Sequence, residues 1–310
     1  MHPAGKQLRA CGTAGRLALR VGAIARGLSA ASLRRAARLL VLTVPTLLLA
    51  CVGERQLSIQ FAAQARGEPL RCDASYEQIG TSRTTLQLLD FKAYVHGVSL
   101  VRKNGERHPL MLEQDGRWQR ETVAMLDFED GTGTCNTGSP EVRTEVVGVV
   151  PDFDDYTGVE FTLGVPRELN HRNVEWVDPP LHLPSMWWSW TYGYRFLRLD
   201  VRAGGNRSYV FHVRADGCSG TPDIGVDCSA ENQGTVFLTG FVPGQSRVVF
   251  DVAALFAQTD FESSGDGMTD PVAGCLSSAD DPECAALLPQ VGLGSGPNAP
   301  GGADAFIRVE

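Results

Sequence analysis

Short runs in which apolar residues alternate with small or polar residues recur along this chain, and they constrain its fold more than any other feature. Successive side chains of a strand point to opposite faces, so each run predicts a strand with one buried face. The clearest runs span residues 91–101, 145–150, 157–163 and 194–201. Turn-forming pairs such as Asn104-Gly105 and Asp115-Gly116 lie between such segments. The pattern predicts an all-β fold.

The same alternation, less marked, predicts further strands. They span residues 208–213, 234–239, 246–252 and, at a sheet edge, 305–310. Only residues 253–258 and 282–288 have helical character, and both segments are short. Many short strands with frequent turns are typical of a sandwich or barrel. We therefore expect a single antiparallel β-sandwich-like domain with long, disulfide-stapled loops.

The N-terminal region has the composition of an export signal. Residues 1–38 are rich in Arg and Ala and contain no Asp or Glu, and an apolar block follows at residues 39–50. A basic segment before about a dozen apolar residues is typical of a secretory signal, and the block is shorter than the roughly 20 residues that span a bilayer. The block ends in Leu48-Leu49-Ala50-Cys51, which resembles a bacterial lipobox. Cys51 is therefore the predicted lipidation site, and ordinary signal cleavage nearby is the alternative.

These features divide the chain into three predicted segments. A lipoprotein-type signal peptide covers residues 1–50, a lipidated tether covers 51–58, and the β domain covers 59–310. We expect an exported protein, periplasmic or at the cell surface, that is attached to a membrane by its N-terminal lipid. Val52, rather than Asp, after Cys51 favours the outer membrane.

Charge and cysteine content limit the class of function. The formal net charge of −8 argues against nucleic-acid binding, which needs clustered Lys and Arg. Six cysteines follow Cys51, and an even number in an exported chain predicts disulfides rather than a zinc site. We favour two disulfides that each close a short local loop and one disulfide between distant cysteines, although spacing alone permits other connectivities. The favoured pairs are Cys72–Cys135, Cys218–Cys228 and Cys275–Cys284.

Motifs for catalysis and for a calcium loop are weak in this sequence. Acidic runs at residues 127–130 and 152–155 offer oxygen ligands for Ca²⁺, but the regular Asp spacing of a calcium loop is missing, and solvated loops are the alternative. The chain contains no G-x-S-x-G, no H-E-x-x-H and no Cys–His arrangement with a free thiol. A binding protein is therefore favoured over an enzyme.

Residues 186–194, MWWSWTYGY, concentrate three of the five tryptophans and two of the six tyrosines. Side chains alternate in an extended segment, so Trp188 and Trp190 are expected on one face and Trp187 on the other. Aromatic side chains at this density serve as core, as a platform for stacking, or as the oxidisable part of a redox or metal site.

Several ordered motifs resemble one known family. They are residues 89–95, 126–135, 156–158, 163–166 and 169–171, the Met-x-Trp-x-Trp set at 186–190, His212 ahead of Gly217-Cys218, and the Cys275…Cys284 loop. Together they resemble the MbnP-like family, also called the metallo-mystery-pair four-Cys motif proteins, over nearly all of the chain from about Ile59 onward.

The resemblance implies an exported copper-binding protein that acts in copper acquisition or storage. It also implies a di-haem partner, similar to MbnH and MauG, that converts a tryptophan of this chain to kynurenine. Trp188 and Trp190 are the first candidates for this change, with Trp118 behind them.

Imidazole nitrogen suits copper, and the chain offers mid-strand histidines to supply it. His96 and His212 each lie within a predicted strand, so two strands are expected to present both rings to one point. His171, in a loop ahead of the aromatic segment, is the next candidate ligand. A half-buried histidine bonded to the backbone is the alternative for each.

The competing hypothesis is a carbohydrate- or surface-binding β-sandwich lipoprotein. In that case Trp187, Trp188, Trp190 and Tyr192 would stack on sugar rings. Copper stoichiometry and the state of the tryptophans distinguish the two hypotheses.

Overall fold

The computed structural model describes residues 52–204, 207–221, 224–262, 273–278, 280–293, 300–302 and 305–310. The predicted signal peptide and the predicted lipidation site at Cys51 lie outside these residues. Within them, no helix has both the length and the apolar character to cross a membrane.

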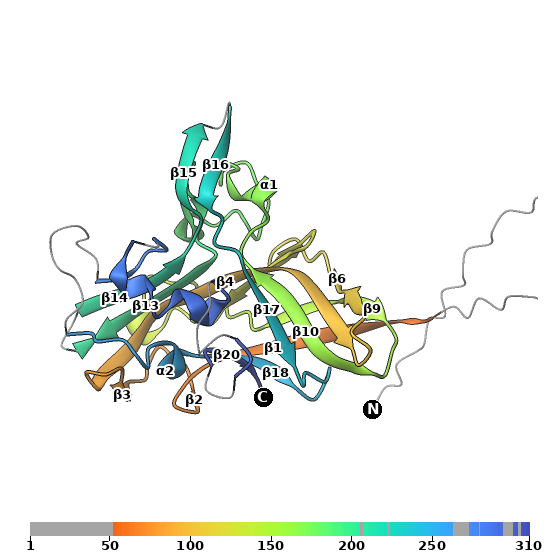
Figure 1. Ribbon diagram of the computed structural model, residues 1–310, viewed down its shortest axis with the longest axis horizontal. Coiled ribbons are helices and arrows are strands. Elements are labelled where there is room, and N and C mark those ends of the chain that lie inside the picture. Colours follow the sequence, from red (N-terminus) through yellow and green to blue (C-terminus); the bar gives the residue numbers. More distant parts are fainter. Residues whose placement is uncertain are drawn as a thin grey trace, which may run out of the picture. The chain divides into compact units, whose positions relative to one another are not determined.

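The smaller of two large sheets has six strands, with the order β20-β18-β1-β9-β6 and with β2 beside β1 (Figure 1). Their bounds are β1 (Glu54–Ala65), β2 (Glu68–Pro69), β6 (Met111–Leu112), β9 (Glu145–Pro151), β18 (Arg247–Asp251) and β20 (Ile307–Val309). The last of these is the edge strand expected near the C-terminus. β1 begins at Glu54, which pairs with Pro151 of β9, so residues 54–58 are strand rather than the expected tether.

The larger sheet has ten strands and is organised around the long strand β4. Its main path is β17-β10-β4-β13-β14-β19, while β3, β5 and β8 pair with β4, and β7 pairs with β8. Their bounds are β3 (Tyr76–Ile79), β4 (Thr84–Arg102), β5 (Arg107–Pro109), β7 (Gln119–Arg120), β8 (Val123–Asp127), β10 (Tyr156–Leu163), β13 (Leu197–Ala203), β14 (Arg207–Val213), β17 (Gly234–Thr239) and β19 (Ala273–Cys275).

Two short ribbons and a few short helices complete the described residues. The ribbons are β11 (Trp187–Ser189) with β12 (Gly193–Tyr194), and β15 (Asp216–Thr221) with β16 (Gly225–Ala230). The helices are α1 (Arg167–Asn170), α2 (Val252–Leu255) and the 3₁₀ turns η1 (Gly133–Cys135), η2 (Pro184–Met186), η4 (Pro282–Cys284) and η5 (Leu288–Val291). In Figure 1 the β15–β16 ribbon projects from the body beside α1.

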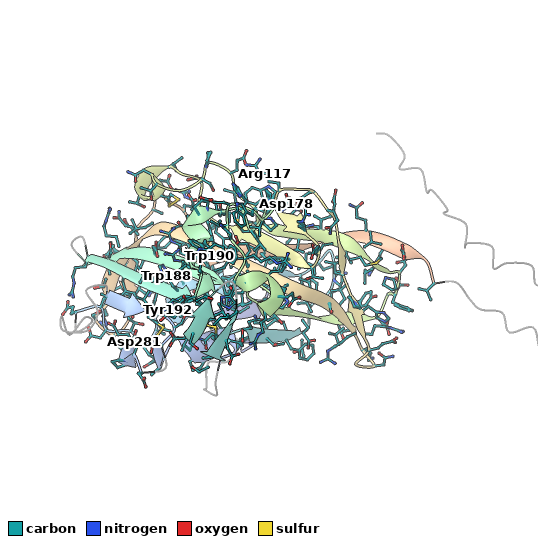
Figure 2. The ribbon with its side chains drawn as sticks, turned by 90° about the horizontal axis from the view of Figure 1, so that it is seen from above. Arg117, Asp178, Trp188, Trp190, Tyr192 and Asp281 are labelled. Atoms are coloured by element: carbon teal, nitrogen blue, oxygen red, sulfur yellow. A yellow bond between two sulfur atoms is a disulfide. The ribbon has the colours of Figure 1, made fainter. Side chains whose placement is uncertain are left out.

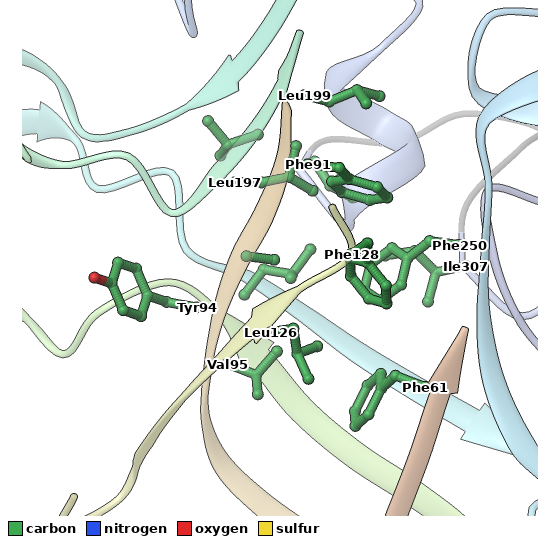
Figure 3. Close-up of a cluster of buried hydrophobic side chains, with 14 of the residues drawn as sticks. Phe61, Phe91, Tyr94, Val95, Leu126, Phe128, Leu197, Leu199, Phe250 and Ile307 are labelled. Atoms are coloured by element: carbon green, nitrogen blue, oxygen red, sulfur yellow. The ribbon is translucent and has the colours of Figure 1, made fainter. Parts of the chain in front are cut away.

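A cluster of phenyl rings joins the two large sheets (Figure 3). Phe61 of β1 packs edge-on against Phe161 of β10, with ring centroids 5.7 Å apart. Phe91 of β4 packs in the same way against Phe250 of β18, also at 5.7 Å. Because aromatic side chains bury large apolar areas, this cluster accounts for the close association of the two sheets. The predicted β-sandwich-like architecture is confirmed.

The strand pairing differs from the prediction in one respect. Most neighbours are antiparallel, but β1 pairs with β18 and β14 with β19 in parallel. Parallel neighbours need a long connection, and these partners are far apart in the sequence. The disulfides join the three favoured pairs, with Cys72–Cys135 as the long-range bridge.

Candidate metal and tryptophan site

The face of the larger sheet that points away from the phenyl cluster carries buried charged side chains. Successive residues of a strand alternate between faces, so Lys92 points away from the core that holds Phe91. The register aligns Lys92 of β4 with Arg198 of β13, and Arg198 with His212 of β14. Asp200 faces Asp90 in the same way. The site grows from this row of residues.

Ion pairs connect the row. Lys92 Nζ lies 2.8 Å from Asp90 and 3.4 Å from Asp127, and it also pairs with Glu129. Arg198 lies 2.9 Å from Asp90 and 2.6 Å from Asp200. Two carboxylates of the first acidic run, Asp127 and Glu129, are thus paired with the Lys92 ammonium group. Asp127 has a second partner, the Ser139 hydroxyl, which donates a hydrogen bond to it at 2.6 Å.

His212 ends the row with one ring nitrogen bonded and the other free. Its Nε2 lies 2.5 Å from Asp200 Oδ1, so Nε2 carries the proton and donates it to the carboxylate. Its Nδ1 is buried and has no partner among the described residues. Burial lowers the pKa of His212, although Asp200 opposes the shift. A neutral imidazole oriented by a carboxylate, with a lone pair on the other nitrogen, is the usual arrangement of a metal-binding histidine.

Trp188 lies beside His212 and in contact with two arginine side chains. The two ring centroids are 6.2 Å apart and edge-on. The guanidinium of Arg195 lies 4.5 Å from the Trp188 ring and that of Arg214 lies 5.1 Å from it. Arg214 also lies 4.2 Å from the ring of Tyr192. Trp188, Trp190 and Tyr192 lie near one another in Figure 2.

The expectation that Trp188 and Trp190 share one face is wrong. β11 ends at Ser189, and the chain then turns to reach β12, so strict alternation stops before Trp190. Trp190 instead packs edge-on against Trp187, with ring centroids 6.0 Å apart. Trp187 is partly buried against the core.

His171 lies near Trp190 and is also oriented. Its Nδ1 donates to the Trp190 carbonyl at 3.1 Å, and its Nε2 faces the Asn170 side-chain amide at 3.3 Å. The Cys228 sulfur is 3.7 Å from Nε2. A cavity of about 440 Å³ is lined by His171, Trp190 and the exposed Trp176. His171 therefore has access to a surface cavity.

His96 does not join this site. Its Nε2 lies 3.2 Å from Gln233 Oε1, and burial lowers its pKa. The register puts His96 four residues along β4 from Lys92, and Lys92 is two strands from His212. At the usual strand dimensions the Cα atoms of the two histidines are about 16 Å apart. The two rings are not presented to one point.

The remaining candidate groups are bound to other protein groups. Trp118 follows a turn in which Asp115 accepts three backbone N–H bonds, and Arg117 lies 5.0 Å from its ring. In the second acidic run, Asp155 pairs with Arg102 at 2.7 Å and Asp152 with Arg55 at 3.5 Å. Three potential metal ligands gather at one point of the described residues, namely Cys72, Glu129 and Cys135, but both sulfurs form a disulfide.

Two arginines of the site were missed by sequence reasoning. Arg195 is the second residue of the predicted strand 194–201 and Arg214 directly follows the predicted strand 208–213, and at such positions a charged residue usually faces solvent. Both are instead directed at Trp188. The sequence offered one sign of a buried charged face in this region. Arg198 and Asp200 lie two residues apart in the predicted strand 194–201, and therefore on the same face of it.

Fold and site together define a disulfide-bonded β-sandwich protein with oriented histidines beside a tryptophan-rich segment. The MbnP family matches residues 54–275, and the chain belongs to this family. It is similar to the solved structure of MbnP from Methylosinus trichosporium, with 30% identity and a TM-score of 0.71. That match covers 83% of this chain and 99% of the other. No curated protein matches the chain.

Proposed function

We propose that this protein is an exported copper-binding protein and the substrate of a di-haem oxidase similar to MbnH and MauG, acting in copper acquisition or storage. The oxidase would convert one tryptophan of this chain to kynurenine. The observation that carries the proposal is the buried Nδ1 of His212, which has no partner among the described residues.

The free nitrogen of His212 is a donor that fits copper. Imidazole nitrogen is a good copper ligand, and a ligand must be unprotonated. His212 Nε2 donates its proton to Asp200 Oδ1, and the two atoms are 2.5 Å apart. The lone pair of the ring is therefore on Nδ1. Bound copper would supply a redox-active cation, and His212 would hold it through Nδ1. Kynurenine would add an aryl amine and a ketone as further donors.

His171 supports the proposal with a second oriented imidazole. Its Nδ1 donates to the Trp190 carbonyl at 3.1 Å, so its lone pair lies on Nε2, which accepts from the Asn170 amide at 3.3 Å. This residue lines the surface cavity of about 440 Å³, and copper that enters from solvent would meet His171 there.

Sugar stacking on Trp188 and Tyr192 is less well supported, because arginine side chains lie against these two rings. Arg195 and Arg214 lie against Trp188, and Arg214 lies against Tyr192. Calcium is not part of the proposal, since the acidic runs pair with Lys92, Arg102 and Arg55. Attachment of a lipid at Cys51, and through it to the outer membrane, remains part of the proposal.

Copper binding can be tested on the chain produced together with its di-haem neighbour. We expect about one tightly held copper per chain, measured by elemental analysis after dialysis against a chelator. Replacing His212 by Asn should remove most of this copper, because Nδ1 is lost from the site. His96→Asn should retain it, because His96 bonds Gln233 away from the site.

The exposed His182 provides a matched control, because its Nδ1 donates to the Val174 carbonyl at 2.7 Å. His182→Asn should bind copper as the unsubstituted chain does. Equal copper content in the His212→Asn and His182→Asn proteins would contradict the site. Absence of both copper and kynurenine in the co-produced protein would contradict the function as a whole.

A further inference from the structure

The disulfide of the β15–β16 ribbon differs from the other two in its exposure. Cys218 and Cys228 are both partly exposed, and their ribbon projects from the body beside α1 (Figure 1). Among the described strands, β15 and β16 pair only with each other. The cysteines of the other two disulfides belong to the core and are each at most 2% exposed, namely Cys72, Cys135, Cys275 and Cys284. A reductant can therefore reach the Cys218–Cys228 bridge without opening either large sheet, and exposed disulfides are in general the labile ones.

An imidazole lies beside this bridge. His171 directly follows α1, and its Nε2 is 3.7 Å from the Cys228 sulfur. The lone pair of the ring is on Nε2, because Nδ1 donates to the Trp190 carbonyl. The only other neighbour printed by the geometry for Nε2 is the Asn170 amide, at a long 3.3 Å that a stronger ligand can replace. Cys218 lies directly opposite Cys228 in the ribbon, so both side chains are on the same face. Two sulfur atoms and one imidazole nitrogen thus gather at one point.

The surface cavity of about 440 Å³ gives access to this point. Val226 lines the cavity and lies two residues before Cys228 on β16, so the two side chains share one face of the strand. His171 lines the cavity as well. An ion from solvent that enters the cavity is therefore next to the imidazole and to the sulfur-bearing face of the ribbon.

We propose that the Cys218–Cys228 disulfide opens under reduction, and that its two thiolates and His171 Nε2 then bind Cu(I). This site is separate from His212 and goes beyond the proposed function. Thiolates are soft ligands that select Cu(I) and Zn²⁺. Structural zinc sites almost always have four protein ligands, whereas three gather here, and this favours Cu(I). The closed disulfide offers no thiolate, so the site exists only in the reduced chain.

The redox step balances with a dithiol reductant of the thioredoxin class. A thiolate of the reductant attacks one sulfur of the bridge, and the S–S bond breaks to give a mixed disulfide. The second thiol of the reductant then resolves it. Two electrons and two protons pass to the chain, which holds two thiols, and the reductant leaves as a disulfide. Binding of Cu(I) needs no further electron transfer and releases the two thiol protons to solvent.

Differential alkylation tests whether this bridge opens selectively. The full chain is incubated with reduced thioredoxin, free thiols are labelled with N-ethylmaleimide, and peptide mass spectrometry locates the label. We expect new label at Cys218 and Cys228 and none at the four core cysteines. Unlabelled Cys218 and Cys228, or equal labelling of the core cysteines, would overturn the inference.

A Cu(I) titration tests the site itself. Thioredoxin is removed without oxygen after the reduction, and Cu(I) is added in competition with bicinchoninate. We expect the reduced chain to bind about one Cu(I) more than the oxidised chain, and Cys228→Ser to abolish this gain. His171→Gln should weaken the added site by about tenfold or more, since even the outer-shell partners of a metal contribute that much. His182→Gln is the matched control and should keep the gain, because His182 is exposed and bonds the Val174 carbonyl.

The comparison of the two redox states needs no substitution, so it holds even where a variant is unstable. Equal Cu(I) binding by the reduced and oxidised chains would overturn the inference and leave the copper site at His212 standing. Displacement of the added Cu(I) by equimolar Zn²⁺ would also overturn it, because the reduced ribbon would then be a zinc site. Loss of copper from the oxidised chain alone would contradict the site at His212 and leave the reduced ribbon site standing.

Discussion

Asp127 illustrates how a single buried carboxyl group depends on its surroundings. Its side chain is fully buried between Lys92, at 3.4 Å, and the Ser139 hydroxyl, at 2.6 Å. Burial raises the pKa of Asp127 to about 6, although Lys92 opposes the shift. The folded chain therefore binds a proton here more tightly than the unfolded chain does, for which the reference pKa is about 3.9.

This difference predicts how stability depends on pH. The contribution of Asp127 is most favourable below pH 4 and is lost as the pH rises through about 6. Asp127→Asn removes the titration and keeps the shape. Between pH 4 and pH 7, the unsubstituted protein should lose up to about 3 kcal/mol of unfolding free energy relative to this variant. Urea unfolding at both pH values gives the difference, and a constant difference would contradict the assignment.

The sequence predicted which residue types belong to the candidate site, but not the distances between their side chains. His212 was a sequence candidate because imidazole suits copper and the position lies mid-strand. Its partner Asp200 and its separation from His96 depend on which strands are neighbours. That order arises from the register of β4, β13 and β14, which no local pattern specifies. The wrong pairing of Trp188 with Trp190 has a similar cause, since the turn after Ser189 interrupts the alternation.

At the level of elements, the period-two pattern located most strands but not their ends or partners. The predicted run 91–101 lies within β4, and 157–163 lies within β10. The helix expected at 282–288 is only the 3₁₀ turn η4, which is closed by the Cys275–Cys284 disulfide. Strand patterns report burial of a face, whereas boundaries depend on tertiary contacts.

The ribbon β11–β12 depends on one glycine. Gly193 has a φ of +72°, and a Cβ there would collide with the side-chain and carbonyl oxygens of Asn170. The Asn170 side chain accepts the Tyr194 N–H at 2.9 Å, which holds the ribbon beside His171. Gly193→Ala should therefore destabilise the protein by about 3 kcal/mol or more and lower kynurenine formation. Urea unfolding and peptide mass spectrometry measure the two effects.

Gly105 supplies the matched control for this substitution. Its φ is +86°, but a Cβ there meets nothing within 4 Å. Gly105→Ala should cost only the backbone strain of about 1–2 kcal/mol and leave kynurenine formation unchanged. If the two variants are equally stable, contact with Asn170 does not determine the position of the ribbon.

At the scale of the whole molecule, the two faces of the larger sheet contribute to two different buried regions. One face of β4 contributes Phe91 to the phenyl cluster between the sheets, and the other contributes Lys92 to the ion-pair row. Tyr94 is on that second face, and its hydroxyl donates to the Pro180 carbonyl at 2.8 Å, so the segment before the aromatic residues covers it. Sequence alternation predicted the first interior. The second follows from a long segment folding over a sheet face, which requires the complete fold.

The phenyl cluster should determine the stability of the whole sandwich, and Phe250 is its centre. Phe250 contacts Phe61, Phe91, Phe128 and Phe306 at ring distances between 5.3 and 6.2 Å. Phe250→Ala should cost about 3–5 kcal/mol of unfolding free energy, because it leaves a cavity between the sheets. Phe237→Ala is the control, since that ring is 42% exposed on β17 and its loss leaves no enclosed cavity. Urea unfolding monitored by tryptophan fluorescence measures both values. Comparable losses in the two variants would mean that the two sheets are held together by contacts other than these rings.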